Sequence, residues 1–480
     1  MIRRSYVLAG ALAGGLAAPT ALRFAVEPAL LVAVPAVLWP RAALALLLAL
    51  TGWWWGSERL QSLDRSALAS LIGTAGNAVV DLKEPPRRGR YTVRVGAVVV
   101  RWSGLPVHET VLLELPSTRA PPPQGARLRV LGTLRAPADF ERTWLRHHGV
   151  RVVLRASASR VIRLRGGLAD RLHAWLAHAS TPGLTGERRA VLQGVVLGED
   201  GGLSDTLRQR FRASGLYHLL AVSGGNVIVV ASGAIALALL LGVSRIGAEV
   251  VALGSIGAYV LAVGPQPSVI RAGVVGALGS LAWLAGRERD RWYALLVAAI
   301  ALLAWNPYTV LDPGFQLSFA AVLSIFVLAP RFLRGLEGYP VPRPLAQCIA
   351  ISTACGLATA PVSWLHFHAI PLLTVPANAA AVPVVTPLLA LALLAAILPP
   401  VGPLLAEING WCAAYLAGCA RLFGGLPGAQ VRSPAAAAGL ASGVLLTAAY
   451  AWRRGQRAEA RLSPLRQRPA EDRPRGTEAA

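Results

Sequence analysis

The second half of the chain is a series of long apolar stretches separated by short polar loops. Stretches of this length with few charges are typical of membrane-spanning helices, since about 20 apolar residues cross the hydrocarbon core of a bilayer. We expect the range 369–398 to be kinked, broken or re-entrant, because several prolines lie within it. We interpret the following ranges as spans: 216–242, 246–263, 268–286, 292–305, 312–330, 345–362, 369–398, 403–424 and 434–451.

Shorter apolar runs occupy the N-terminal residues 1–56, at 6–22, 28–39 and 42–55. Arg3 and Arg4 before the first run resemble the start of a signal peptide, but the further runs favour an uncleaved anchor. Basic residues before a first span place the N-terminus in the cytoplasm. The prediction is therefore a polytopic α-helical membrane protein with about 12 spans.

Residues 57–170 follow a different pattern, in which apolar and polar positions alternate. A period of two bounded by turn residues indicates short antiparallel strands, here at 91–100, 108–115, 127–134 and 150–164. About five strands in this length predict a small N-terminal extramembrane β-barrel of the OB type. The next residues, 172–212, predict amphipathic helices at the membrane surface or over the bundle.

Charge refines this topology. The 480 residues are 54% hydrophobic and carry a net charge of +23, which arginine supplies almost alone. With the N-terminus inside, the β segment falls outside and most arginine-rich loops fall in the cytoplasm, as the positive-inside rule requires. Arg421 and Arg432 are exceptions, on the outer side. The predicted domains are 1–56 (helices), 57–170 (outer β domain), 171–452 (membrane domain) and 453–480 (disordered, basic, cytoplasmic).

The β segment is itself basic, and several of its arginines alternate along the predicted strands. Such residues belong either to a solvated strand face or to a groove that follows a phosphate backbone. Aromatic residues that could stack on bases are scarce there, so both interpretations stay open. The candidate DNA-contacting residues are Arg127, Arg129, Arg151 and Arg155.

Polar residues interrupt the apolar spans near their predicted outer ends. The first group is His218 with Ser223, Gly224 and Asn226. Polar groups in hydrocarbon are costly unless they face protein or a water-filled cavity, so this group predicts a pore lining. Packing of helices against the glycines is the alternative interpretation.

Two further groups lie later in the chain. Ser268 follows a proline pair as a helix N-cap, so Arg271 stands in a first turn that suits an anion; the alternative is that Arg271 extends to the membrane interface. Asp312 before Pro313 is typical of another N-cap, or pairs with Arg271 at a pore mouth, with Gln316 one turn further in.

Several kinds of chemistry lack support in the sequence. The four cysteines lie in apolar stretches and predict buried thiols, and the His366–Phe–His368 triplet lacks the remaining ligands of a hydrolase metal site. No nucleotide-binding loop or catalytic triad pattern is present, so we expect no cofactor, no metal and no ATP-driven engine. A membrane hydrolase using His218 and Ser223 is disfavoured, because their spacing puts them about 140° apart on a helix.

These motifs together resemble the ComEC/Rec2 family of competence proteins. The similarity lies in short segments in the family's order: 138–149, 214–224, 267–272, 312–319 and 376–387, the last containing Asn378. Gly225 and Asn226 stand where many members carry Leu–His. Longer members continue into a metallo-β-lactamase-like domain, which we do not find before Ala480, so we expect no nuclease activity.

The resemblance implies a plasma-membrane channel that carries single-stranded DNA into the cytoplasm during natural transformation. It also implies an external DNA receptor, a cytoplasmic DNA-translocating ATPase and a separate nuclease as partners. The predicted channel lining is His218, Ser223, Gly224, Asn226, Ser268, Arg271, Asp312, Gln316 and Asn378. The alternative is a membrane carrier for another anionic solute or lipid; the driving force and a homo-oligomeric state stay open.

Overall fold

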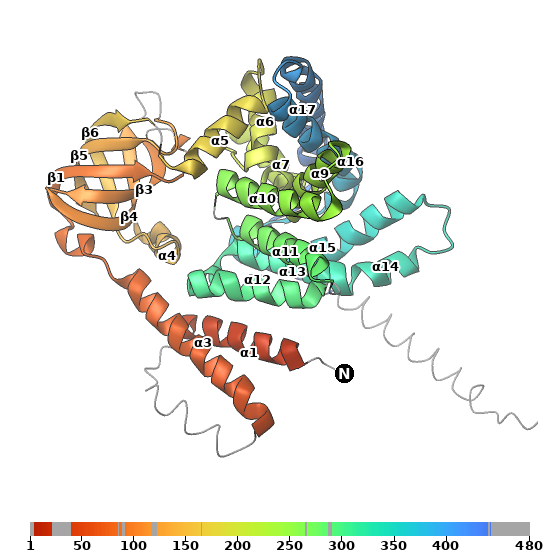
Figure 1. The fold of residues 1–480 in the computed structure, drawn as a ribbon, viewed down its shortest axis with the longest axis horizontal. Helices are drawn as coiled ribbons and strands as arrows, with labels where there is room; N and C mark the ends of the chain where they lie inside the picture. The colour runs from red at the N-terminus through yellow and green to blue at the C-terminus, as the bar shows by residue number, and fades with distance from the viewer. Residues whose placement is uncertain are drawn as a thin grey trace, which may run out of the picture.

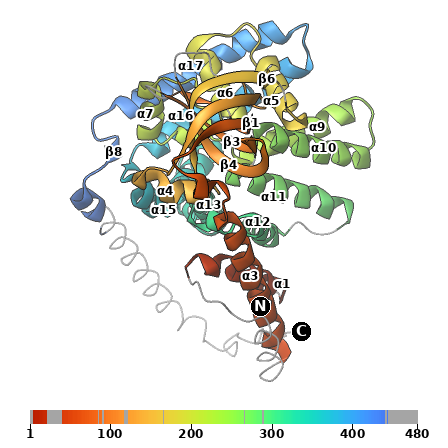
Figure 2. The ribbon, with the colours of Figure 1, turned by 90° about the vertical axis from the view of Figure 1, so that its left-hand side faces the viewer.

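The computed structural model describes residues 4–439 except 22–39, 85, 89–91, 117–121, 165, 265 and 287–289, together with residue 442. The described chain is mostly helical, with a β-sheet region near the N-terminus (Figure 1). The sheet lies beside one end of the helical bundle. Seen from the sheet side, its strands stand in front of the bundle (Figure 2).

The sheet region closes on itself. Its strands are β1 (Ala75–Leu82), β2 (Arg87–Arg88), β3 (Thr92–Trp102), β4 (Leu105–Pro116), β5 (Arg127–Arg135) and β6 (Val153–Arg163). They follow the order β1-β5-β6-β4-β3-β2, and a further β1–β3 pairing returns the ring to its start. β4 and β6 run parallel, whereas their other neighbours are antiparallel.

Alternation of side chains explains why these segments form strands. In β3 every second residue from Val93 to Val99 is buried, and the residues between them are only partly covered. The inward valines, leucines and alanines of all five long strands form one core. The sequence pattern predicted four of these strands but missed β1, and it missed the short helix α4 (Asp139–His147).

Two N-terminal helices lie below the bundle in Figure 1: α1 (Arg4–Ala17) and α3 (Pro40–Asp64). α1 packs along α3, where Gly15, Gly52 and Gly56 allow the two backbones to approach closely. α3 continues past the apolar run to Asp64, next to the sheet. The expected run 28–39 and the first three residues lie outside the described residues.

Short helices connect the sheet to the bundle: α5 (Leu168–Ala179), α6 (Gly186–Leu197), α7 (Asp205–Ala213) and α8 (Tyr217–Leu220). They confirm the helical prediction for 172–212. α6 ends at Gly198, which adopts a positive φ of 76° at the helix C-terminus. Only residues that tolerate this left-handed conformation suit the position.

The bundle follows, and its helices match the predicted spans closely in position. They are α9 (Gly224–Leu240), α10 (Arg245–Val263), α11 (Pro267–Leu284), α12 (Arg291–Trp305), α13 (Pro313–Val327), α14 (Ala329–Gly335), α15 (Arg343–Phe367), α16 (Thr374–Ile397) and α17 (Gly402–Gly425). The expected span 216–242 is divided by residues 221–223 into α8 and α9. Of the last expected span, 434–451, residues 434–439 and 442 are described and helical, and the rest lies outside the described residues, as does the tail.

Four of these helices, α10, α11, α15 and α16, are long and apolar enough to cross a membrane. α13 and α14 make a fifth if the pair, bent by 44°, counts as one broken span. The 369–398 range does not break within its helix, because α16 runs on through Pro383 and Pro387 after a short strand, β7 (Ile370–Pro371). β7 pairs with β8 (Gln430–Val431).

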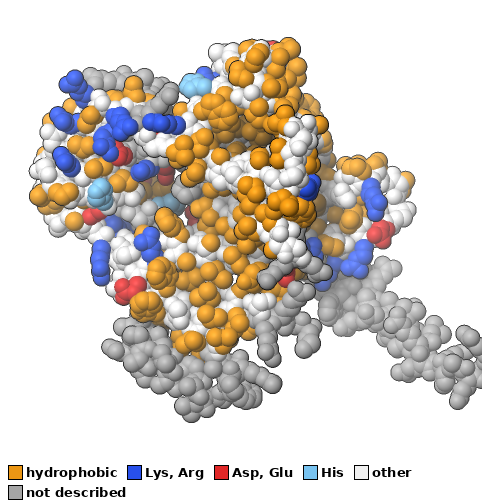
Figure 3. All heavy atoms as spheres, viewed as in Figure 1, with side chains coloured by type: hydrophobic (Ala, Val, Ile, Leu, Met, Phe, Trp, Pro, Cys, Tyr) orange, Lys and Arg blue, Asp and Glu red, His pale blue; other side chains and the backbone are white. Residues whose placement is uncertain are grey.

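The two parts of the molecule differ at their surfaces. Apolar side chains cover much of the helical part, whereas lysine and arginine side chains gather over the sheet region (Figure 3). A large core joins α6 and α7 to α9, α16 and α17. The cysteines are free; Cys419 is buried as expected, whereas the other three are half-buried. The apolar surface of these helices is that of a membrane protein.

Candidate functional site

A hydrogen bond from a neighbouring helix stabilises the non-helical segment between α8 and α9. Residues 221–223 are not helical, and Ser223 has the extended backbone of an N-cap. The prediction that Ser268 caps α11 is wrong, because the N-cap is Gln266 and Ser268 lies in the first turn. The Ser268 hydroxyl donates instead to the Val222 carbonyl at 2.9 Å. Two of the polar groups predicted from the sequence therefore meet, and Ser268 bonds to a backbone group that the break has freed.

Arg271 lies at this meeting point. Its guanidinium Nη1 donates to the Ser318 carbonyl of α13 at 2.8 Å, and the side chain is only 8% exposed. Gly224 faces it, since a Cβ added there would stand 4.0 Å from the Arg271 Nη2. Within the described part of the chain, no carboxylate forms an ion pair with this arginine.

Of the two interpretations of Asp312, the N-cap is confirmed and the pair with Arg271 is wrong. Asp312 caps α13, accepting from the Phe315 backbone N–H at 3.1 Å. Its other oxygen lies 3.6 Å from Nε2 of His148, just after α4 of the sheet region. The carboxylate thus contacts the N-terminus of α13 with one oxygen and His148 of the sheet region with the other, so it connects two parts of the molecule.

Gln316 contacts His366, for which the sequence indicated no metal site. Its amide nitrogen donates to the Val310 carbonyl at 2.9 Å, and its Oε1 lies 2.9 Å from Nε2 of His366 at the end of α15. The histidine has no metal cluster around it, because no group of three or more potential ligands occurs in the described residues. The pairing with Gln316, 50 residues away, left no signal in the sequence.

Asn226 ties the break to α6. Its side chain is 4% exposed, and its Nδ2 donates to the Val195 carbonyl at 2.7 Å while its Oδ1 accepts from Ser223 at 3.0 Å. Tyr259 bonds the adjacent Val196 carbonyl at 2.7 Å. This network fixes the end of α6 against α9 and α10. His218, by contrast, is exposed, and its Nδ1 lies 2.8 Å from the Gly215 carbonyl.

Asn378 stands apart from these residues, on α16. It is buried, its Nδ2 donates to the Ser352 hydroxyl at 3.1 Å, and its Oδ1 has no hydrogen-bond partner in the described structure. A buried acceptor without a donor is destabilising. The structure thus brings Gly224, Ser268 and Arg271 together where α9 and α11 begin, and Arg271 reaches α13 at the Ser318 carbonyl. Gln316 lies on the same helix, α13, and bonds to α15 through His366. Within the described residues, His218 and Asn378 form no hydrogen bond to this set.

The four predicted arginines of the sheet region fall into two kinds. Arg127 forms two hydrogen bonds to Asp81, at 2.6 and 2.8 Å, and these lower the pKa of that carboxyl. Arg151 pairs with Asp64. Arg129 and Arg155 are exposed and, as far as the structure describes the chain, have no carboxylate partner.

Strand register shows that Arg129 belongs to a row of exposed arginines across neighbouring strands. Arg129 on β5 stands opposite Arg160 on β6 and opposite Val79 on β1, and Val79 in turn stands opposite Arg101 on β3. All three arginines are exposed. Like charges directly across strands are destabilising. The row therefore favours an anionic partner, and Arg101 and Arg160 were missed because pairing across strands is not visible in the sequence.

A separate cluster joins the sheet region to the helices. Asp64, at the end of α3, accepts from Arg146 of α4, pairs with Arg151, and accepts from the Tyr308 hydroxyl at 3.0 Å. Asn306 donates to the His147 carbonyl at 2.9 Å. Burial alone would raise the pKa of Asp64, but the hydrogen bond from Arg146 and the charge of Arg151 outweigh it and lower the pKa.

Apolar helices of membrane length around a buried arginine without a counter-charge define a helical membrane protein with a polar site inside its bundle. The chain belongs to the ComEC/Rec2 family of competence proteins: the family model described as competence protein matches residues 195–456, more than half of the chain. This range contains the whole set from Gly224 to His366.

The chain is also similar to individual proteins. The chain is 31% identical to ComE operon protein 3 of Bacillus subtilis over 41% of this chain and 24% of that protein. It is 29% identical to competence protein ComA of Neisseria gonorrhoeae over 54% of this chain and 39% of that protein. It is also 29% identical to the uncharacterized protein YcaI of Escherichia coli, over 27% of that protein. The chain matches less than half of each relative's length, and no solved structure matches it.

Proposed function

We propose that this chain forms a conduit through which single-stranded DNA enters the cytoplasm during natural transformation. The supporting observation is Arg271, a buried guanidinium whose hydrogen bond goes to a backbone carbonyl and not to a carboxylate. A buried charge without a partner costs several kcal/mol. Such a residue is retained where a ligand supplies the missing charge, and guanidinium suits the phosphodiester of a DNA strand.

The surroundings of Arg271 fit such a path. Gly224 leaves space beside the guanidinium, because a Cβ added there would stand 3.8 Å from Cβ of Ala272 and 4.0 Å from Nη2 of Arg271. Ser268, Gln316 and His366 add hydroxyl, amide and imidazole groups on adjoining helices. In this proposal His218, Ser223, Asn226, Asp312 and Asn378 shape the remaining lining or hold its walls in place.

The sheet region would receive the DNA first. We assign it to the OB type because its long strands join in the order β1, β3, β4, β6, β5 and back to β1, with β4 and β6 parallel. Its helix α4 lies between β5 and β6. The row of Arg101, Arg129 and Arg160 then follows a phosphate backbone, and Arg155 extends the basic surface.

The membrane arrangement of the proposal is multi-pass, with about 12 spans, both termini in the cytoplasm and the sheet region outside. Its domains are 1–56, 57–170, 171–452 and the tail 453–480. The chain acts without catalysis of its own. An external DNA receptor, a DNA-translocating ATPase and a separate nuclease supply delivery, force and strand degradation.

The test replaces Arg271 in a naturally competent bacterium that carries this chain in place of its own family member. Arg271→Met should lower transformation roughly 10- to 150-fold, the loss expected for a charge-assisted contact of about 1.5–3 kcal/mol. Arg271→Lys should fall in between, since it keeps the charge and loses the fork geometry. Arg343→Met, an exposed arginine at the start of α15, is the matched control and should transform normally.

Protein abundance separates function from folding. Arg271→Met should accumulate at the wild-type level or above it, because the change removes an uncompensated buried charge. Normal transformation by Arg271→Met would contradict the proposal. If that variant instead loses uptake of inorganic phosphate into proteoliposomes while DNA uptake persists, the chain is a carrier for a smaller anion.

A further inference from the structure

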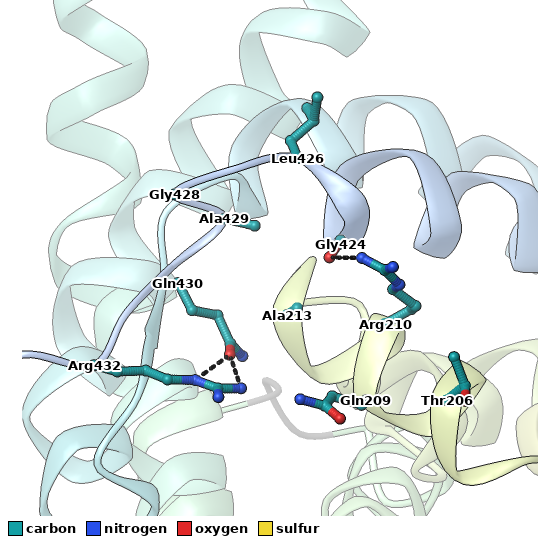
Figure 4. A pocket seen from close by; sticks show the side chains of 10 residues that line it. All are labelled: Thr206, Gln209, Arg210, Ala213, Gly424, Leu426, Gly428, Ala429, Gln430 and Arg432. Carbon is teal, nitrogen blue, oxygen red and sulfur yellow. Dashed lines mark hydrogen bonds between the residues drawn. The ribbon is translucent and has the colours of Figure 1, made fainter.

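A cavity of about 360 Å³ lies between α7 and the segment that follows α17, away from the Arg271 site. This volume is in the range of sites that hold small ligands. Figure 4 shows Thr206, Gln209 and Arg210 of α7 on one side and Gln430 and Arg432 on the other, with Leu426 at the edge.

The cavity is cationic. Among the described residues, two arginines line it and no aspartate or glutamate does. Arg210 donates to the Gly424 carbonyl at 2.9 Å, and Arg432 donates twice to Oε1 of Gln430, at 3.1 and 2.8 Å. Both guanidinium groups keep further N–H donors, and Thr206 and Gln209 add a hydroxyl and an amide. The lining therefore offers several donors and two charges to an anion such as a phosphate ester.

Glycine at the end of α17 makes the wall of this cavity possible. A Cβ added to Gly424 would stand 2.3 Å from the Arg210 carbonyl oxygen, and one added to Gly425 would stand 3.3 Å from its Nη1. Only residues without a side chain let the end of α17 lie this close to α7. The close approach fixes Arg210 in position over the cavity.

An apolar stripe runs along α17 and continues to Leu426, which follows the helix. Its members on α17 recur at helical spacing on one face, and each member is between 46% and 65% exposed. The opposite face packs against α6, α7 and α16. Because Leu426 lines the cavity as well, the stripe and the cationic site are continuous. The stripe consists of Leu404, Ile408, Trp411, Tyr415, Leu422 and Leu426.

We propose that this cavity binds the phosphate headgroup of an anionic phospholipid whose acyl chains lie along the α17 stripe. The stripe decides between phosphate sources: free phosphate gains nothing from it, and a DNA strand has no long apolar part to cover it, whereas a lipid joins an anionic phosphate to acyl chains. The site also accounts for Arg432, which departs from the positive-inside pattern. It is independent of DNA transport.

Native mass spectrometry of the purified full chain tests the site after incubation with vesicles of phosphatidylglycerol or of phosphatidylcholine. The wild type should retain phosphatidylglycerol, and Arg210→Gln with Arg432→Gln should weaken retention about tenfold. Arg334→Gln with Arg343→Gln removes the same charge from exposed positions and should retain the lipid normally. Equal retention by the cavity variant, or equal retention of phosphatidylcholine by the wild type, would overturn the proposal.

Two further measurements test the cavity itself and the other phosphate sources. Thr206→Trp fills the cavity without touching either arginine, and it should also weaken retention; a filled cavity that still holds the lipid contradicts the site. Inorganic phosphate and a single-stranded oligonucleotide are the competitors. Displacement of phosphatidylglycerol by the oligonucleotide at equal concentration would assign the cavity to DNA, and binding of phosphate without binding of lipid would assign it to the free ion.

Discussion

Asp64 offers a sharp test of how the sheet region is attached to the helices. The carboxylate, 22% exposed, ends α3 and holds Arg146 of α4, Arg151 ahead of β6 and the hydroxyl of Tyr308. Asp64→Asn keeps the size of the side chain and removes its charge. Arg151 would then lose its carboxylate partner. Its buried Nε already has no hydrogen-bond partner among the described residues.

The magnitude follows from this partial burial. Breaking a fully buried ion pair costs about 3–5 kcal/mol, whereas an exposed pair contributes about 0–1 kcal/mol. A carboxylate shared by two arginines that are 25% and 33% exposed falls between these limits, at about 2–3 kcal/mol. If α4 detaches as a unit, its backbone amides should exchange hydrogen roughly 30- to 150-fold faster.

Hydrogen exchange of α4 in the full chain measures this effect. Asp139→Asn is the matched control, because it removes a 91% exposed carboxylate from an i,i+3 pair with Arg142 on the same helix. The control should change exchange by less than about fivefold, the equivalent of about 1 kcal/mol. If Asp64→Asn changes α4 no more than Asp139→Asn does, the cluster does not hold the two parts together.

Acid provides a second readout with a definite sign. The pKa of Asp64 in the folded chain is lowered below its ordinary value of 3.8, since its hydrogen bonds and nearby charges outweigh desolvation. A lowered folded pKa contributes stability above the unfolded pKa, and this is lost as pH falls through the folded pKa. The difference between wild type and Asp64→Asn, corrected for intrinsic exchange, should persist from about pH 7 to about pH 5 and shrink only below pH 3.8. A difference that disappears near neutral pH would contradict the assigned contacts.

Other predictions concern the arginine row and one turn. Replacing Arg129 and Arg160 with glutamine should reduce the salt dependence of single-stranded DNA binding, measured by fluorescence anisotropy, by about 0.7 in log–log slope per arginine. Arg127→Gln, whose charge already pairs with Asp81, should change the slope less, and equal slopes for all variants would remove the row from the DNA path. Gly215→Ala should destabilise the chain by about 2–4 kcal/mol in thermal unfolding, because φ is 77° and the new Cβ would stand 2.2 Å from Oγ1 of Thr374. Thr374→Ala should relieve part of that loss; no relief would mean that backbone strain alone is responsible.

Local patterns in the sequence predicted much of this fold. Apolar runs indicated the helices from α9 to α17, because a helix in an apolar environment needs apolar side chains along its whole length. Proline and aspartate at 312–313 indicated the start of α13 because an N-cap satisfies backbone groups within the same turn. α4 was not predicted because it has only nine residues and lies between two strand-forming segments of the β region.

The candidate site likewise has features that the local sequence determined and contacts that only the tertiary structure decided. The sequence by itself determined which residues were polar within apolar helices and where helices began, since these depend on neighbours a few positions away. Only the tertiary structure decided that Arg271 meets the Ser318 carbonyl, that Asp312 turns to His148, and that the apolar face of α17 ends at two arginines. The physical reason is that partners 30 or more residues apart are chosen by which helices pack side by side, and that choice depends on the whole core.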